Sequence, residues 1–497
     1  MSLLLILAVV LLVAYLTINW FKDQPKTPLP PGPSFLECLQ ITWRMLRKND
    51  THLIAEDLRK RYGEIFNIRL FSSNLVFLNS SRLMRKLFAS GQYRDVTNDR
   101  PWTFFGEHIC YDCRMMVSRN YNQMFVKVRK LIHGTIKLYG DGIKVFEDMV
   151  NGEIKILQKE LENSTLRASF DLDNALKVSL IRVIHIFLTN ERPTDSKECK
   201  YICETIVNYD HSDNEMYNSF LLNTCPWVRF LPGRGRQLYK GALEARDRLI
   251  NLYRNPSIAK RMESSGGGLL GKLLNEAEHD KDIDETTIKG VLVDMVSAGY
   301  LTTKGALSGF FLLMLYYPEI QRRIQEEIDD NIGGDREPSL DDRSVMHYTN
   351  AAILECLRFT SHVPIGIPHV ARVEIDVEGM RIPANTTMLT NYWSANRSDE
   401  YWDKPNVFTP ERFLDGDGKL LPSEHILRSQ LILFGVGRRQ CVGESFAKSR
   451  IFLYVTSLLQ KFDFLPGDNE LAPLDSTTWK ADTVMQPDFL NCIVRMR

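Results

Sequence analysis

The segment that decides the fold reads "FGVGRRQCVGESFAKSRIF" and runs from Phe434 to Phe452. From Glu444 onward its apolar residues recur at helical spacing, so the segment predicts a loop followed by a helix. Cys441 lies just before that helix, where unpaired N–H groups and the positive end of the helix dipole favour a thiolate. Glycines on both sides of the cysteine allow an irregular loop and a close approach of the backbone to a flat object. A thiolate in such a loop suits a soft metal or nucleophilic attack.

The spacing around the cysteine fits the pattern F-x-x-G-x-R-x-C-x-G. The matching residues are Phe434, Gly437, Arg439, Cys441 and Gly443. A lone cysteine beside a glycine-rich turn is usually structural, but the full pattern resembles the haem-binding loop of the cytochrome P-450 family. The resemblance implies haem b (iron protoporphyrin IX) with the Cys441 thiolate as its axial ligand. It also makes Arg439 the first candidate to bind a haem propionate.

A second match precedes the cysteine loop. In "LECLRF", Glu355 and Arg358 stand three residues apart, on one face of a predicted helix where the pair can bond. Arg412 follows in "FTPERF", between that helix and the cysteine loop. Solvated pairs of this kind are common, but in this order the three residues look like the family's Glu-Arg-Arg network. Because a buried carboxylate between two guanidiniums is costly to break, the resemblance implies a structural role.

The run from 288 to 317 predicts one long buried helix, yet "AGYLTTKG" at 298–305 is a poor choice for its middle. A glycine inside a helix costs about 0.5–1 kcal/mol relative to alanine, and threonine can bend a helix. A close crossing of two helices is one explanation for the small residues. The resemblance offers another, because it identifies this run as the family's distal helix. Ala298 and Gly299 then leave room for oxygen, and the Thr302 hydroxyl binds oxygen or an ordered water and relays protons.

One residue of this helix departs from the family pattern. The family usually has Asp or Glu immediately before the threonine, and this chain has Leu301. Either protons take another path, through water or through Asp294, or the chemistry needs less proton delivery. The departure keeps open an isomerase or dehydratase of the same fold that does not need O2.

Haem propionates need cationic or hydrogen-bonding partners, and the resemblance suggests two further positions. The family carries a W-x-x-x-R pair on an early helix, and "FVKVRK" offers Phe125 and Arg129 in its place, without the indole N–H. In "IPHVAR", His369 stands where relatives have a propionate-binding His or Arg. Each of these residues is otherwise explained as a surface cation or a core aromatic.

Basic residues also gather near the cysteine loop. They include Arg438, Lys448 and Arg450. Such a group forms either a docking face for an acidic reductase or ordinary solvated charge.

Alternation of polar and apolar residues predicts strands in three places: 63–80, 367–392 and the carboxyl-terminal "FLNCIVRMR". Helical patterns dominate the rest. The predicted fold class is therefore mainly α with small β-sheets (α+β), and the resemblance implies the cytochrome P-450 fold. We expect residues 35–497 to form a single large haem-thiolate catalytic domain.

The amino terminus predicts a membrane anchor. Leu3 to Phe21 holds no charge and is about long enough to cross a bilayer as a helix. A cleaved signal peptide is the alternative, but the run is long for one and lacks a basic start and an A-x-A site. We therefore expect a single-pass anchor at 1–21, a Pro-rich linker at 22–34, and a cytosolic catalytic domain on the endoplasmic reticulum membrane.

Composition narrows the partners. Lys+Arg and Asp+Glu both number 62, which argues against nucleic acid, and nine scattered cysteines do not form a disulfide framework. The resemblance implies a monooxygenase that inserts one atom of O2 into a lipophilic small molecule, such as a steroid, fatty acid or xenobiotic. Its electrons come from NADPH through a flavoprotein reductase, with a small b-type cytochrome as an optional donor, and membrane lipid surrounds its anchor. A non-catalytic haem-binding or lipid-binding membrane protein is the remaining alternative.

Overall fold

The computed structural model describes residues 28–47, 50–70, 73–136, 141–165, 169–217, 219–467, 470–479 and 483–497. The predicted anchor at 1–21 and the first part of the predicted linker lie outside these residues, so both boundaries stay predictions. Among the described helices, none combines the length and apolar character needed to cross a membrane. All nine cysteines are free thiols, as expected from their scatter along the chain.

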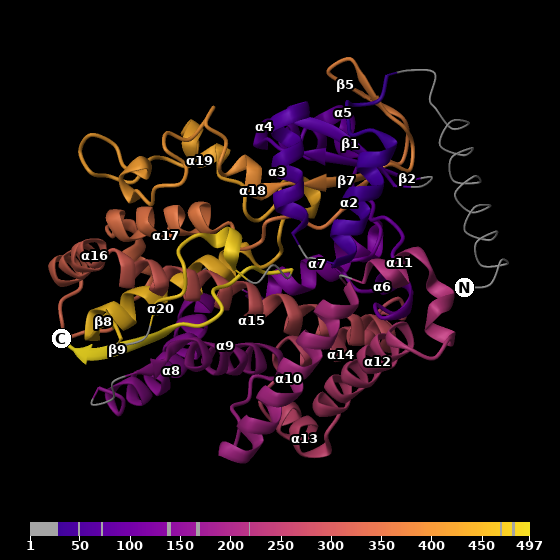
Figure 1. The fold of residues 1–497 in the computed structure, drawn as a ribbon. Coiled ribbons are helices and arrows are strands. Elements are labelled where there is room, and N and C mark those ends of the chain that lie inside the picture. The colour runs from indigo at the N-terminus through magenta and orange to yellow at the C-terminus, as the bar shows by residue number, and fades with distance from the viewer. Residues whose placement is uncertain are drawn as a thin grey trace. The chain divides into compact units, whose positions relative to one another are not determined.

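The chain divides into two units. Unit 1 comprises Met1–Pro101, Ile365–Ala395 and Gly435–Arg439; unit 2 comprises Trp102–Pro364, Asn396–Phe434 and Gln440–Arg497. Both units appear in Figure 1. The first unit collects the early strands and the second collects most of the helices.

Unit 1 is built on a four-stranded sheet of order β1-β2-β7-β4. Its strands are β1 (Ile65–Leu70), β2 (Ser73–Leu78), β7 (Thr387–Thr390) and β4 (His369–Val370). The predicted alternation at 63–80 forms the antiparallel β1–β2 hairpin, and β7 pairs in parallel with β2. A second sheet joins β5 (Ile375–Val377) to β6 (Met380–Ile382). Its helices are α2 (Phe35–Arg47), α3 (Thr51–Tyr62), α4 (Ser81–Phe88), α5 (Gly91–Arg94), α18 (Tyr392–Ala395) and η4 (Gly437–Arg439).

Unit 2 is a helical body with one three-stranded sheet of order β3-β9-β8. The strands are β3 (Phe170–Asp171), β9 (Asn491–Met496) and β8 (Phe462–Pro466), so the carboxyl-terminal strand is confirmed. The helices before its centre are α6 (Phe104–His108), α7 (Gln123–Ile136), α8 (Asp141–Glu162), α9 (Leu172–Thr189), α10 (Ser196–Tyr217), α11 (Phe220–Thr224), η1 (Pro226–Phe230), α12 (Arg234–Tyr253), α13 (Pro256–Ser264) and α14 (Gly268–His279). The later helices are α15 (Glu285–Tyr316), α16 (Pro318–Asn331), η2 (Leu340–Ser344), α17 (His347–Thr360), η3 (Pro410–Phe413), α19 (Ile426–Gln430), α20 (Glu444–Lys461) and η5 (Ser476–Thr478).

Helix α15 is the 32-residue core of unit 2 and corresponds to the helix predicted at 288–317. Its first turn is capped by Asp284, whose side chain accepts a hydrogen bond from the Thr287 N–H. The apolar side chains of α15 are distributed around the whole helix, as expected for a helix inside a core. It packs against α9, α17 and α20 (Figure 1). The prediction of a mainly helical body with small sheets is confirmed.

Candidate functional site

The cysteine loop ends where the sequence predicted, since α20 begins at Glu444 with Gly443 as its N-cap residue. The Cys441 N–H donates to the Phe434 carbonyl at 2.7 Å and closes the loop. The Cys441 side chain is exposed, although the protein around it is sufficient to disfavour the charged thiolate. A Cβ added to Gly443 would meet the Cys441 sulfur at 4.0 Å, an ordinary contact. The thiol is thus accessible at the start of a buried helix.

Opposing effects act on the pKa of the Cys441 thiol. Burial raises the pKa of the thiol, and Glu444 adds to the rise, whereas a hydrogen bond from the Gly443 backbone and the charges of Arg129 and Arg450 lower it. The hydrogen bond from the Gly443 backbone is the helix-terminus effect that the sequence predicted, and in the free thiol burial opposes it more strongly. A metal at the sulfur deprotonates such a thiol outright. The loop fits a thiolate that forms on metal binding.

Helix α15 is continuous through "AGYLTT", but this part of the helix includes an exposed residue. Ala298 is exposed and Thr302 is half-buried, in a helix whose other residues are mostly buried. The Thr302 hydroxyl donates to the Ala298 carbonyl at 2.9 Å, so it follows its own helix and remains accessible. Leu301 beside it is half-buried and offers no proton. One side of this turn therefore carries an accessible methyl group and an accessible hydroxyl.

Gly299 lies on the side of the turn that faces helix α9. A Cβ added there would lie 2.5 Å from Cδ1 of Ile184, a residue of α9. The absent side chain thus allows α15 and α9 to pack closely. This corrects the prediction that Gly299 leaves room for oxygen, and it favours the helix-crossing explanation at this one position.

Asp294, the suggested alternative acid, lies two turns before Thr302, about 12 Å away along the helix axis. Its carboxylate is buried and accepts a hydrogen bond from the Met116 N–H. Burial raises its pKa to about 7, and a nearby Asp213 adds to the rise. The group can exchange a proton near neutral pH, but the hydrogen bond that it accepts comes from the backbone before α7.

Helix α7 carries the predicted Phe125 and Arg129. Phe125 is buried, with its ring centroid 5.4 Å from that of Tyr121. Arg129 is half-buried; burial lowers its pKa and the Cys441 thiol opposes the shift. Among the residues that the structure describes, Arg129 makes no hydrogen bond and no ion pair. A guanidinium in this position, within electrostatic reach of the cysteine, is suited to a carboxylate.

Arg439 and His369 both belong to unit 1. The Arg439 side chain is buried and its Nε–H donates to the Asn98 carbonyl at 2.7 Å. His369 stacks on Phe88 with ring centroids 4.0 Å apart, and its Nδ1–H donates to the Thr97 carbonyl at 2.8 Å.

His369 is neutral in this setting. Burial, then the charges of Arg100 and Arg439, hold its pKa well below the usual value. A carbonyl only accepts, so Nδ1 carries the proton and Nε2 presents a lone pair. A hydrogen bond from Nε2 to a carboxylate would require the protonated ring, so the propionate-binding role of His369 stays a prediction.

Gly437 has a local explanation in unit 1. Its φ of +74° is rarely adopted by other residues, and an added Cβ would lie 2.0 Å from the Phe88 carbonyl oxygen. The glycine therefore lets η4 approach the end of α4. Its place in the pattern is explained by backbone packing, whatever binds nearby.

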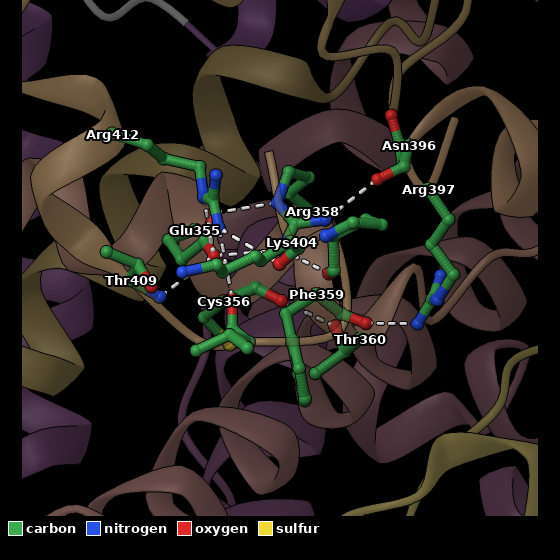
Figure 2. A network of polar contacts seen from close by, with 12 residues as sticks. Glu355, Cys356, Arg358, Phe359, Thr360, Asn396, Arg397, Lys404, Thr409 and Arg412 are labelled. Atoms are coloured by element: carbon green, nitrogen blue, oxygen red, sulfur yellow. Dashed lines mark hydrogen bonds and ion pairs between the residues drawn. The ribbon is translucent and has the colours of Figure 1, made fainter. Parts of the chain in front are cut away.

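The residues of the second match come together in unit 2 (Figure 2). Glu355 and Arg358 are fully buried in α17 and form a two-pronged ion pair with distances of 2.7 and 2.9 Å. Arg412 of η3 donates to the same carboxylate at 3.0 Å, and so does the Thr409 N–H. The Glu355 carboxylate is thus held between two guanidiniums, as the sequence suggested.

The predicted docking face is not supported in full. Arg450 is only 2% exposed, so its assignment to a surface is wrong. Lys448 is paired with Glu444 and lies 5.2 Å from the ring centroid of Phe434. Arg438 forms an ion pair with Asp95 within unit 1.

Sequence reasoning missed the contact that Arg450 makes. Its Nη2 donates to the Gly299 carbonyl and to the Thr303 hydroxyl, each at 2.8 Å. A signal was present, because Arg450 follows Ala447 by three residues and precedes Tyr454 by four, on the apolar stripe of α20. A charged residue on such a stripe is buried with the stripe.

Comparison with known proteins agrees with the site. The sequence profile of the cytochrome P450 family matches residues 27–490. A vitamin D(3) 25-hydroxylase from Sus scrofa is 29% identical over 470 residues, covering 92% of this chain and 90% of that protein. Cytochrome P450 2D6 from Homo sapiens is 30% identical over 463 residues, covering 90% and 88%.

Two further relatives extend this picture. A steroid 17-alpha-hydroxylase/17,20 lyase from Rana dybowskii is 28% identical over 480 residues, covering 94% of this chain and 90% of that protein. A zebra fish cytochrome P450 solved with progesterone has a TM-score of 0.76 at 24% identity, covering 90% of this chain and 99% of that one. The structural likeness shows a shared fold.

Proposed function

The chain belongs to the cytochrome P450 family, whose members bind haem through a cysteine thiolate, and we propose that Cys441 supplies that thiolate here. It is accordingly an enzyme, and the non-catalytic alternative is set aside. The observation that carries the assignment is the accessible Cys441 thiol at the start of α20, which packs against α15. When bound, the haem supplies the redox chemistry by which one atom of O2 enters a substrate.

The residues of unit 2 fit this cofactor. Arg129 offers a guanidinium without a described partner, and a haem propionate is the kind of carboxylate it suits. Phe125, one turn earlier on α7, is buried and supplies packing without a hydrogen-bond donor. Cys441 gives a single soft ligand.

Thr302 is the residue that we assign to the oxygen side. Its hydroxyl reaches only the Ala298 carbonyl of its own helix and can rotate to accept a proton or hold a water. Ala298 keeps the adjacent surface small. Leu301 supplies no acid, so the proton that reaches Thr302 comes through water rather than from the preceding residue.

The substrate that we propose is a lipophilic small molecule of the steroid or sterol type. Support comes from the names of two relatives, a vitamin D(3) 25-hydroxylase and a steroid 17-alpha-hydroxylase/17,20 lyase. We propose NADPH-derived electrons from a membrane-bound flavoprotein reductase, and attachment to the endoplasmic reticulum by the segment at 1–21.

Reconstitution tests this function directly. The full chain, loaded with haem, is combined with an NADPH-dependent reductase and a lipid extract under isotopically labelled O2. We expect a product that carries one labelled oxygen and depends on NADPH, measured by mass spectrometry. Cys441→Ala is expected to lose the red-shifted band of the ferrous–CO complex, and an unchanged band contradicts the ligand assignment.

A second candidate function is favoured by Leu301. An isomerase or dehydratase of this fold needs no proton delivery to O2, so a leucine at this position costs it nothing. Turnover of an oxidised lipid without NADPH, and without uptake of labelled oxygen, supports this candidate and contradicts the monooxygenase.

A further inference from the structure

Arg450 is a buried cation that joins two helices of unit 2. The side chain is 2% exposed and reaches from α20 to α15. Its Nη2 donates to the Gly299 carbonyl and to the Thr303 hydroxyl, each at 2.8 Å. These two acceptors bracket the turn that carries Thr302. The residue therefore contacts the back of the turn whose front is the proposed oxygen side.

The guanidinium is only partly satisfied. Its Nε and Nη1 are buried and have no hydrogen-bond partner among the residues that the structure describes. Among the described residues no carboxylate pairs with it, in contrast to the buried Arg358, and the Phe446 ring lies 4.2 Å away. Burial lowers its pKa to about 10, so the group stays positive at neutral pH, and the acidic groups that act on it are Tyr454 and Cys441. Buried charges are normally paired, so this one needs a counter-charge.

We propose that Arg450 is a positioning residue for both sides of the haem site: it provides the fixed positive charge that balances the Cys441 thiolate, and it holds the turn from Gly299 to Thr303. The proposal rests on the proposed function, because the thiolate is present only when Cys441 binds the iron. The thiolate carries the negative charge that the buried guanidinium otherwise lacks. A cation and an anion attract strongly through the low-dielectric interior between them.

The consequence concerns the electron-donating power of the ligand. A fixed positive charge near the thiolate withdraws negative charge from the sulfur, and groups around a haem ligand tune the reduction potential. Arg450 is therefore expected to keep the ferric/ferrous potential more positive than a neutral side chain would. The two hydrogen bonds to α15 have a separate effect, since they hold Thr302 in place.

Four variants separate charge from hydrogen bonding. Arg450→Gln removes the charge and keeps a hydrogen-bond donor, whereas Arg450→Lys keeps the charge. Thr303→Val removes one acceptor and keeps the charge. Lys461→Gln is the matched control, because it removes the same charge from the exposed end of the same helix.

The measurement is the ferric/ferrous potential of each haem-loaded full chain, with the ferrous–CO spectrum recorded alongside. We expect a negative shift and a faster loss of the thiolate-type CO band in Arg450→Gln only. Thr303→Val is expected to keep the potential but to release more peroxide per NADPH. Equal potentials for Arg450→Gln and Lys461→Gln overturn the charge role. Failure of the wild-type protein to show the thiolate band contradicts the proposed function instead.

If Arg450→Gln does not bind haem, a second measurement tests the charge role. The potential of Arg450→Lys is then followed from neutral to alkaline pH, since a buried lysine loses its proton within that range. A potential that falls as pH rises, while that of the wild type stays flat, supports the charge role. A flat profile for the lysine variant overturns it.

Discussion

Arg358 and Arg450 are both buried arginines of unit 2, but their surroundings differ. Arg358 donates twice to Glu355 and once each to the carbonyls of Asn396 and Pro405, so every nitrogen has a partner (Figure 2). Within the described part of the chain, Arg450 donates through Nη2 alone. Arg358 is explained by what the polypeptide itself provides. Arg450 is not, and an incompletely satisfied buried cation calls for a functional explanation.

The largest effect is expected when the carboxylate that satisfies Arg358 is removed. Glu355→Gln leaves Arg358 and Arg412 facing a neutral amide in a fully buried position. We expect a loss of about 3–5 kcal/mol in the free energy of unfolding, together with poor haem loading. Chemical unfolding followed by circular dichroism measures the first, and the haem absorbance measures the second.

The control for this prediction is an exposed pair of the same chemistry. Glu411 and Arg323 form an ion pair in which both side chains are about half exposed. Glu411→Gln is expected to cost about 0–1 kcal/mol, because water screens such a pair. Equal losses for the two variants contradict the structural role of the Glu355 network.

Asp294 shows a third way to bury an ionisable group, which is to keep its proton. Burial raises its pKa from 3.8 to about 7. Between these values the folded chain binds a proton that the unfolded chain releases, so stability falls as the pH rises. The effect is on the order of 2–4 kcal/mol. Asp294→Asn is expected to flatten this pH dependence of the unfolding midpoint.

Part of the slope remains in that variant, because burial also raises the pKa of Asp213 to about 7. Asp213→Asn in the same background removes this remainder. An Asp294→Asn protein with the full wild-type slope contradicts the assignment of the proton to Asp294.

The next prediction concerns the acceptor of Arg450. Gly299→Ala places a methyl group 2.5 Å from the Ile184 Cδ1, and crowding of this kind costs about 1–3 kcal/mol. Removal of a mid-helix glycine returns about 0.5–1 kcal/mol, so we expect a net destabilisation of about 1 kcal/mol. In an Ile184→Ala background, which lacks both Cδ1 and the Cγ1 that would lie 3.1 Å from the added methyl group, the same change is expected to stabilise the protein. The same sign in both backgrounds contradicts the packing explanation.

Patterns confined to one stretch of sequence were predictable. The start of α20 at Glu444 and the extent of α15 follow from local periodicity. The Glu355–Arg358 pair was recognisable because its members are three residues apart on one helix. The strands at 63–80 and at the carboxyl terminus followed from alternation.

Contacts between distant segments were not predictable. Arg450 contacts Gly299 across 151 residues of sequence, and the local pattern of neither segment predicts this contact. The tautomer of His369 depends on the Thr97 carbonyl, 272 residues earlier. The thiol pKa of Cys441 depends on burial, which the sequence pattern around it does not quantify. Burial and long-range partners therefore decided the points on which the sequence interpretation failed.

Two adjacent hydroxyls of α15 also differ in their surroundings. Thr303 is buried and accepts from Arg450, whereas Thr302 is accessible and donates only within its own helix. Thr302→Ala is therefore expected to change the free energy of unfolding by less than about 0.5 kcal/mol, while Thr303→Ala costs about 1–3 kcal/mol because it leaves Arg450 with a further unsatisfied donor. Catalysis is expected to show the reverse order. Thr302→Ala should raise peroxide release per NADPH more than Thr303→Ala, and an equal effect of both variants on stability and on coupling shows that the two faces of this turn are not functionally distinct.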